Sequence, residues 1–82
     1  MKRRVNFSMP SLDLGGVPLR TIAWLAPQGS RVVEGEKLLE VLAGEIAVEL
    51  TAPATGILAQ RLVGTSEPLH IGQVLAIIES DR

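Results

Sequence analysis

Apolar and polar residues alternate along most of this chain with a period of two, which is the pattern of β-strands that bury one face. Clusters of Gly and Pro separate the short apolar segments, and no stretch shows a convincing helical periodicity. This spacing is typical of an all-β sandwich or flattened barrel. The expected strands and extended segments cover residues 5–9, 21–25, 31–33, 37–42, 46–51, 56–63, 68–71 and 74–79.

The central feature of the pattern is a reversal between two apolar stretches in residues 37–53. Gly44 supplies the positive φ that a tight turn requires, so the two stretches are expected to form a β-hairpin. The period of two places the Glu45 side chain outward, in water, if the alternate apolar residues of the second strand point inward. Those inward residues are Ile46, Val48 and Leu50. The expected tip consists of Ala43, Gly44, Glu45 and Ile46.

The chain also contains a weak internal repeat at a shift of 37 residues, which aligns Gly35 with Gly72. The apolar pairs that match at this shift are Leu25 with Leu62, Val32 with Leu69, Leu38 with Leu75, and Val41 with Ile78. Such a repeat predicts two similar halves related by a pseudo-twofold axis. By that symmetry, the two chain ends are expected to lie together, opposite the central hairpin.

Size and composition narrow the function. A chain of 82 residues makes one domain with no room for a deep catalytic cleft. With one Trp, one Phe and no Tyr, its core must be aliphatic, and Trp24 is expected to pack half-buried rather than to stack on a ligand. The absence of Cys excludes disulfides, and a single His leaves no candidate for a transition-metal cluster.

Charge divides the chain into a basic start and an acidic body. We expect residues 1–4 to be a flexible basic N-terminus, residues 5–80 the folded domain and residues 81–82 a tail. Residues 5–82 carry five basic against nine acidic side chains, which does not suit a nucleic-acid binder. No apolar run approaches the roughly 18 residues that span a bilayer. We therefore expect a cytoplasmic protein. We also expect it to be monomeric when isolated, and the initial Met favours a freestanding small protein.

Several segments together resemble the lipoyl domain of the biotinyl/lipoyl carrier family, as found in the acyltransferase component of 2-oxo acid dehydrogenase complexes. These segments are MPSL at 9–12, TIAWL at 21–25, GEKLLEV at 35–41, AVELTAP at 47–53, TGIL at 55–58 and IGQVLAII at 71–78. The resemblance implies a flattened barrel of two four-stranded antiparallel sheets with pseudo-twofold symmetry, in agreement with the periodicity and the repeat.

The chain departs from the family pattern at the hairpin tip. Lipoyl domains present Asp-Lys-Ala there, with lipoate joined to the lysine as an amide, and biotinyl relatives present Met-Lys-Met. Counting back from the Ala-Pro pair at 52–53, the lysine falls on Glu45, the Asp on Gly44 and the following residue on Ile46. A carboxylate cannot supply the nucleophilic amine, and the two lysines of the chain lie at 2 and 37. We therefore expect no lipoate or biotin on this chain.

The loop after MPSL departs as well. In the family it is acidic and ends in Glu-Gly-Thr, whereas here it reads DLGGVPLRT, with Leu19 in place of the glycine and Arg20 in place of the threonine. The resemblance places this loop beside the modified turn, where it helps to present that turn to other enzymes. Both modification and partner recognition are expected to differ from those of the family.

Three functions follow from these residues. The first is a noncatalytic module that docks on a partner in a multienzyme complex, an enzyme of the 2-oxo acid dehydrogenase-like, carboxylase or biosynthetic kind. The second is a swinging-arm carrier modified at a site not evident here, such as Lys37. The third, an enzyme, has the least support, because no spacing unites its acid and base candidates. Those candidates are Asp13, Glu45, Glu49 and His70.

Two interpretations of Glu45 remain open from the sequence. The residue is either a selected recognition group or a solvated turn residue left after an attachment site decayed.

Overall fold

The computed structural model describes residues 2–12 and 14–80, and strands are its regular elements. The eight strands are β1 (Arg3–Ser8), β2 (Leu19–Trp24), β3 (Arg31–Val32), β4 (Lys37–Ala43), β5 (Ile46–Thr51), β6 (Gly56–Arg61), β7 (Pro68–Leu69) and β8 (Val74–Ser80). The all-β prediction is confirmed. Asp13 and the expected tail at 81–82 lie outside the described residues. No helix long and apolar enough to cross a membrane occurs in the described part of the chain.

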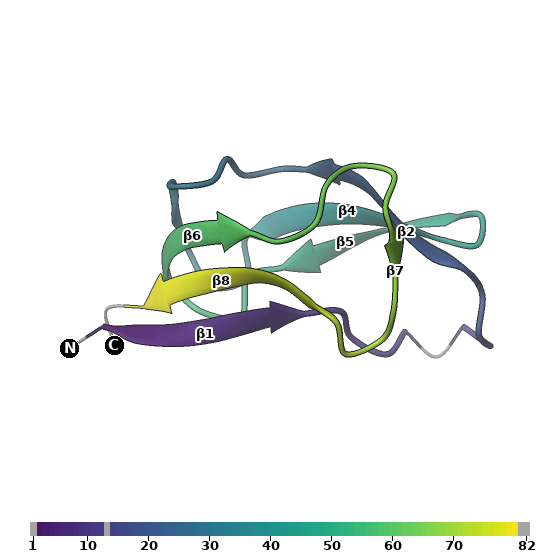
Figure 1. The fold of residues 1–82 in the computed structure, drawn as a ribbon, viewed down its shortest axis with the longest axis horizontal. Helices are drawn as coiled ribbons and strands as arrows, with labels where there is room; N and C mark the ends of the chain where they lie inside the picture. Colours follow the sequence, from purple (N-terminus) through teal and green to yellow (C-terminus); the bar gives the residue numbers. More distant parts are fainter. Residues whose placement is uncertain (1, 13, 81–82) are drawn as a thin grey trace.

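The strands form two four-stranded antiparallel sheets that pack face to face (Figure 1). One sheet has the order β1-β8-β6-β3 and the other has the order β5-β4-β2-β7. Each sheet takes two strands from each half of the chain, so neither half can complete a sheet alone. The described structure measures 40 × 20 × 18 Å. The β4–β5 turn lies at one end of the long axis, and the start of β1 pairs with the end of β8 at the other end, as the repeat predicted (Figure 1).

The internal repeat is confirmed in the backbone. The bounds of β2, β3 and β4 become those of β6, β7 and β8 when 37 is added. The ladder irregularity between Thr21 and Ala23 recurs between Leu58 and Gln60. The pseudo-twofold symmetry therefore extends to hydrogen-bond register.

The first and fifth strands are related by a different shift, of 43 residues. The Met9 N–H donates to the Gln73 carbonyl at 2.8 Å, and the Ala52 N–H donates to the Glu36 carbonyl at the same distance. Between β1 and β2 the chain therefore holds six more residues than between β5 and β6. We call residues 9–18 the β1–β2 connection. It is the main departure from the symmetry, and it matters for the site described below.

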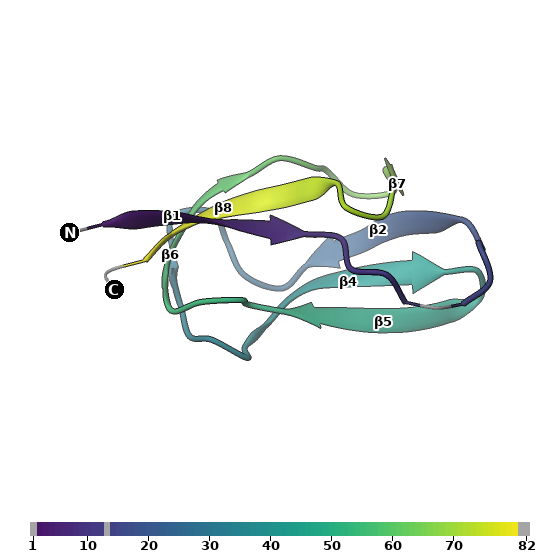
Figure 2. The ribbon, with the colours of Figure 1, turned by 90° about the horizontal axis from the view of Figure 1, so that it is seen from below.

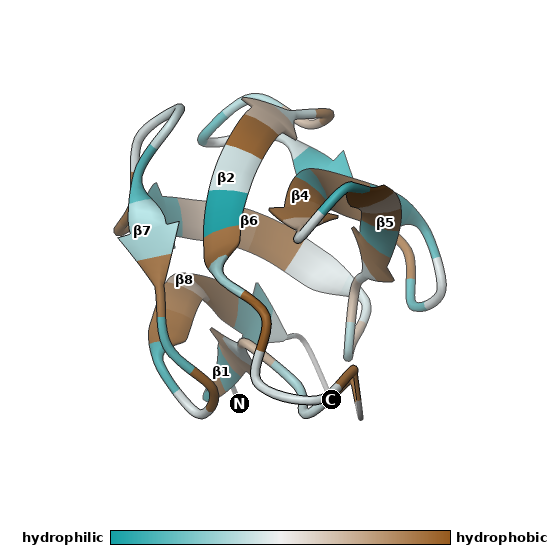
Figure 3. Cartoon of the chain, turned by 90° about the vertical axis from the view of Figure 1, so that its right-hand side faces the viewer, coloured by the Kyte–Doolittle hydropathy of each residue, from teal (hydrophilic) through white to brown (hydrophobic). Residues whose placement is uncertain are grey.

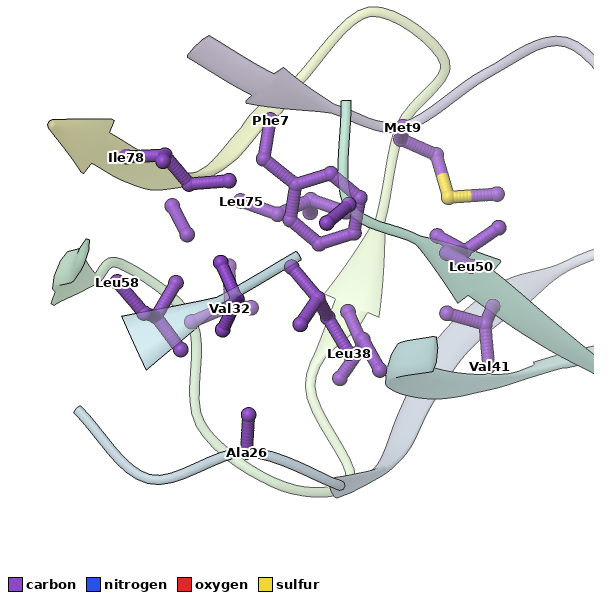
Figure 4. Close-up of a cluster of buried hydrophobic side chains, with 14 of the residues drawn as sticks. Phe7, Met9, Ala26, Val32, Leu38, Val41, Leu50, Leu58, Leu75 and Ile78 are labelled. Atoms are coloured by element: carbon purple, nitrogen blue, oxygen red, sulfur yellow. The ribbon is translucent and has the colours of Figure 1, made fainter. Parts of the chain in front are cut away.

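A single aliphatic core fills the space between the sheets (Figure 4). Its most deeply buried large side chains are Met9, Val32, Leu38, Leu39, Val41, Leu58, Leu75 and Ile78. Trp24 packs half-buried against this core, as expected: its ring meets Phe7 edge-on at 6.3 Å between centroids, and its Nε1 donates to the Val63 carbonyl at 2.9 Å. Arg61 covers the same ring, with its Cζ 5.6 Å from the centroid.

Three differences from the sequence predictions bear on the site. Other strand ends shift by one or two residues, as in β6, which ends at Arg61 rather than at residue 63. β1 begins at Arg3 rather than Val5, because Arg3 and Arg4 continue the antiparallel ladder opposite Ser80 and Glu79 of β8. The expected flexible segment thus contributes two residues to a sheet. β2 likewise begins at Leu19, two residues early, because Leu19 pairs with Ala43 of β4.

The third difference concerns the inward direction predicted for Ile46. Along β5 Leu50 is buried and Val48 is half-buried, but Ile46 is 56% exposed. β5 is an edge strand, so Ile46, at its outer end, has a neighbouring strand on one side only. The period of two was correct, whereas the depth of burial depended on the position in the sheet.

Candidate functional site

The hairpin tip is a two-residue turn made of Gly44 and Glu45. Ala43 and Ile46 are the last cross-strand pair before this turn. Gly44 adopts φ +61°, in the left-handed region that favours glycine and permits so tight a reversal. Glu45 is exposed. A carboxylate therefore stands at the end of a ladder that runs the full length of β4 and β5.

The β1–β2 connection supports the tip from the side. The Gly44 N–H donates to the Pro18 carbonyl at 2.9 Å. A Cβ on residue 44 would lie 3.4 Å from the Val17 Cβ, which is tight for two carbons. Val17 and Pro18 of the connection thus lie against the turn itself. The family resemblance had placed this loop beside the turn, and the hydrogen bond confirms that placement. The sequence did not identify Val17 and Pro18 as the residues in contact.

Exposed apolar residues occur at the same end of the molecule as the Glu45 turn, the end that faces the viewer in Figure 3. Leu14, in the β1–β2 connection, is 38% exposed, and Ile71, after β7, is 61% exposed. Both line a shallow depression together with Val17. We call Leu14, Val17, Glu45, Ile46 and Ile71 the tip surface. It joins one anionic group to a patch of exposed branched aliphatic side chains, a combination suited to contact with another protein.

Neither lysine of the chain lies at the tip. Lys37 is the first residue of β4, at the far end of the hairpin, where it pairs in register with Thr51. Its Nζ is 2.9 Å from Glu49 Oε1 in an exposed salt bridge. Lys2 precedes β1, whose start lies at the opposite end of the molecule from the turn.

The acid and base candidates that the structure describes, Glu45, Glu49 and His70, do not form one constellation. Glu49 lines a groove between β1 and β5, whereas His70 lines a separate depression beside β7. The His70 N–H donates to Gln73 Oε1 at 2.9 Å, so its backbone serves the turn before β8. No group of three or more His, Asp or Glu side chains able to hold a metal occurs in residues 2–12 and 14–80. The described candidates thus lie at three separate places: the hairpin turn, the groove between β1 and β5, and the depression beside β7.

A comparison with known protein families identifies the family to which this chain belongs. The family model described as "Biotin-requiring enzyme" matches residues 5–78, nearly the whole described chain. The chain belongs to the biotin/lipoyl family. The resemblance inferred from the sequence segments is thereby confirmed, as is the sandwich that it implied.

Two curated relatives of this biotin/lipoyl domain are acyltransferase components. It is 30% identical over 73 residues to the dihydrolipoyllysine-residue acetyltransferase component of the acetoin cleaving system of Pseudomonas putida, a match covering 89% of this chain and 20% of the relative. It is 37% identical over 59 residues to the dihydrolipoyllysine-residue succinyltransferase component of the 2-oxoglutarate dehydrogenase complex of Bacillus subtilis (strain 168), a match covering 71% of this chain and 14% of the relative. The biotin/lipoyl domain thus spans a small part of each relative.

Proposed function

We propose that this biotin/lipoyl domain is a noncatalytic module that carries no lipoate or biotin and acts by docking on an enzyme of a multienzyme complex. One observation carries the proposal: Glu45, a carboxylate, stands at the two-residue turn of the central hairpin. We assign this turn as the counterpart of the attachment turn in the family. Acylation at such a turn requires a nucleophilic amine, and this chain has none there.

The positions of the two lysines support the assignment. Lys37 is held beside Glu49 at the far end of the hairpin, and Lys2 lies at the opposite end of the fold. A ligase that recognises an exposed hairpin turn would therefore have no amine to modify within this turn. The names of both curated relatives include a dihydrolipoyllysine residue, so the absence of lysine between residues 38 and 82 is a chemical difference from them.

The tip surface supplies the recognition role in this proposal. Glu45 favours a basic group on the partner, and Leu14, Ile46 and Ile71 favour an apolar recess around it. We infer a partner of the 2-oxo acid dehydrogenase-like, carboxylase or biosynthetic kind. The curated relatives, components of an acetoin cleaving system and of a 2-oxoglutarate dehydrogenase complex, support the first of these. The rigid turn contributes to affinity because it is already ordered before binding.

The first test concerns modification. The wild-type chain is incubated with lipoate ligase or biotin ligase, ATP and the free acid, and its intact mass is measured. We expect no mass gain, while an acyltransferase lipoyl domain that carries its attachment lysine in the unmodified form, treated in parallel, gains one group. A wild-type adduct would overturn the proposal that this chain is not a carrier.

The second test concerns recognition. Tagged wild-type chain, Glu45→Gln and Glu34→Gln are used to capture proteins from the native host, and the captured enzymes are quantified by mass spectrometry. Glu34 is exposed in a turn outside the tip surface, so its variant matches the charge change. We expect Glu45→Gln to reduce recovery of a multienzyme component about fivefold, as for loss of one charge contact, and Glu34→Gln to leave it unchanged. Equal recovery with all three chains would argue against recognition by the tip.

A second candidate, a swinging-arm carrier, is favoured by the family match over residues 5–78. It requires modification at Lys37 or at a residue outside this sequence. Peptide mapping of any adduct found in the ligase experiment separates the two candidates, because an adduct on Lys37 supports the carrier.

A further inference from the structure

The sandwich has two open sides, and only one of them is bounded by long strands. On that side, β1 is the edge of one sheet and β5 is the edge of the other (Figure 2). On the opposite side, β3 and β7 are two residues each. No Cα atom of β1 lies within 8 Å of a Cα atom of β5, whereas paired strands run about 4.8 Å apart. Each long edge therefore has unpaired backbone groups along six residues.

A groove of about 430 Å³ separates these two edges. It opens onto the core: Phe7 and Leu50, both buried, contribute to its lining, and the half-buried Leu12 and Val48 flank them. Among the described residues that line the groove, Glu49 is the one that carries a charge. The groove therefore combines an apolar floor with one acidic group on its β5 wall.

The two edges differ in how they are protected. Basic side chains on an edge strand disfavour pairing with another strand. β1 begins with Arg3 and Arg4, whereas β5 contains neither Lys, Arg nor Pro. β5 also exposes 56% of Ile46 at its outer end. A cationic strand would be repelled by the start of β1. On β5, Glu49 forms an exposed salt bridge with Lys37, and a basic group on the incoming strand would compete for the same carboxylate, so charge complementarity favours β5.

We propose that the β5 edge binds an extended peptide segment of a partner protein, which adds to the sheet as a fifth strand. The segment alternates apolar side chains, which face the groove, with polar ones, and it carries a basic residue opposite Glu49. Backbone hydrogen bonds to β5 would supply affinity, and Glu49 together with the apolar groove would supply selectivity. This inference does not depend on the proposed function, because it uses the sheet edge rather than the acceptor position.

The probe is the acetylated, amidated peptide Thr-Val-Lys-Val-Thr-Val, titrated into the ¹⁵N-labelled chain and followed by amide shifts and hydrogen exchange. We expect saturable binding, with slower exchange concentrated in β5. The same peptide N-methylated at alternate residues keeps its side chains but loses the N–H groups of one edge, and we expect it not to bind. Absence of binding by the unmodified peptide, or protection confined to β1, would overturn the proposal.

Two variants test the charge assignment. Glu49→Lys should weaken binding about threefold or more, the size of a cross-strand charge pair. Lys37→Ala removes the cation now paired with Glu49 without changing the groove, so it should tighten binding of the same peptide. A peptide with Glu in place of Lys should bind more tightly to the Glu49→Lys chain than to the wild-type chain. Identical affinities across these combinations would contradict the role of Glu49. Hydrogen-exchange protection of β5 that grows with chain concentration in the absence of peptide would show that a second copy of the chain occupies the edge instead.

Discussion

Replacing Gly56 by Ala is expected to destabilise the fold by about 3 kcal/mol or more, out of roughly 4–12 kcal/mol available to a domain of this length. A Cβ at Gly56 would lie 2.1 Å from the Glu79 carbonyl oxygen and 2.8 Å from the Ser80 Cα. Both are backbone atoms of β8, so relief requires the strands to separate where Gly56 pairs with Ser80. Urea denaturation followed by circular dichroism measures the loss.

Gly64→Ala is the matched control for this substitution. Neither glycine has a positive φ, so both changes avoid left-handed strain. The nearest atom to a Cβ at Gly64 is Glu67 Oε2 at 3.8 Å, the end of a flexible side chain. We expect its stability to stay within about 0.5 kcal/mol of wild type. If Gly56→Ala proved as stable as Gly64→Ala, the register between β6 and β8 would be wrong.

Replacing Glu45 by Lys is expected to convert an unmodified chain into a substrate for lipoate or biotin ligase. The substitution places an amine at the exposed turn without adding a Cβ clash or changing the left-handed glycine beside it. Intact mass should rise by one lipoyl or biotinyl group, and peptide mapping should locate it at position 45. The change is from no modification to a modified population, the largest functional effect that a single substitution in this chain should produce.

Glu34→Lys controls for the effect of a new lysine in an exposed turn. Like Glu45, Glu34 is exposed and next to a glycine with positive φ, Gly35 at +89°, but it lies outside the hairpin. We expect no adduct on this variant. Equal modification of both lysines would show that the ligase reads any exposed amine, which would remove the support for the assigned turn.

A folded but unmodified Glu45→Lys chain calls for the double variant with Gly44→Asp, which restores the acidic neighbour of the family pattern. Asp tolerates the left-handed region better than most residues. Its Cβ would contact the Val17 Cβ at 3.4 Å, and a non-glycine residue at φ +61° is strained, so some stability is lost. If the double variant also stays unmodified, either the turn is not the attachment counterpart or the β1–β2 connection blocks the ligase.

The sequence by itself determined the strands, the central hairpin and the two-halved plan. Each depends on local chemistry or on a repeat: alternation sets which residues share a face, Gly44 permits the turn, and the shift of 37 residues relates Leu38 to Leu75 and Val41 to Ile78, all fully buried. The replacement of an amine by a carboxylate at Glu45 could also be recognised from the sequence, because the functional group of a side chain is a property of one residue. The individual residues that lie near Glu45 could not be identified from the sequence in the same way.

Only the tertiary structure decided which individual residues contact one another. It identified Val17 and Pro18 as the residues of the β1–β2 connection that lie against Gly44, whereas the family resemblance had placed only the loop as a whole beside the turn. It also exposed Ile46, whose apolar character alone had favoured burial. The physical reason is the same in both cases: alternation fixes the direction of a side chain, whereas burial depends on which strands stand beside it, and here each sheet draws its strands from both halves of the chain.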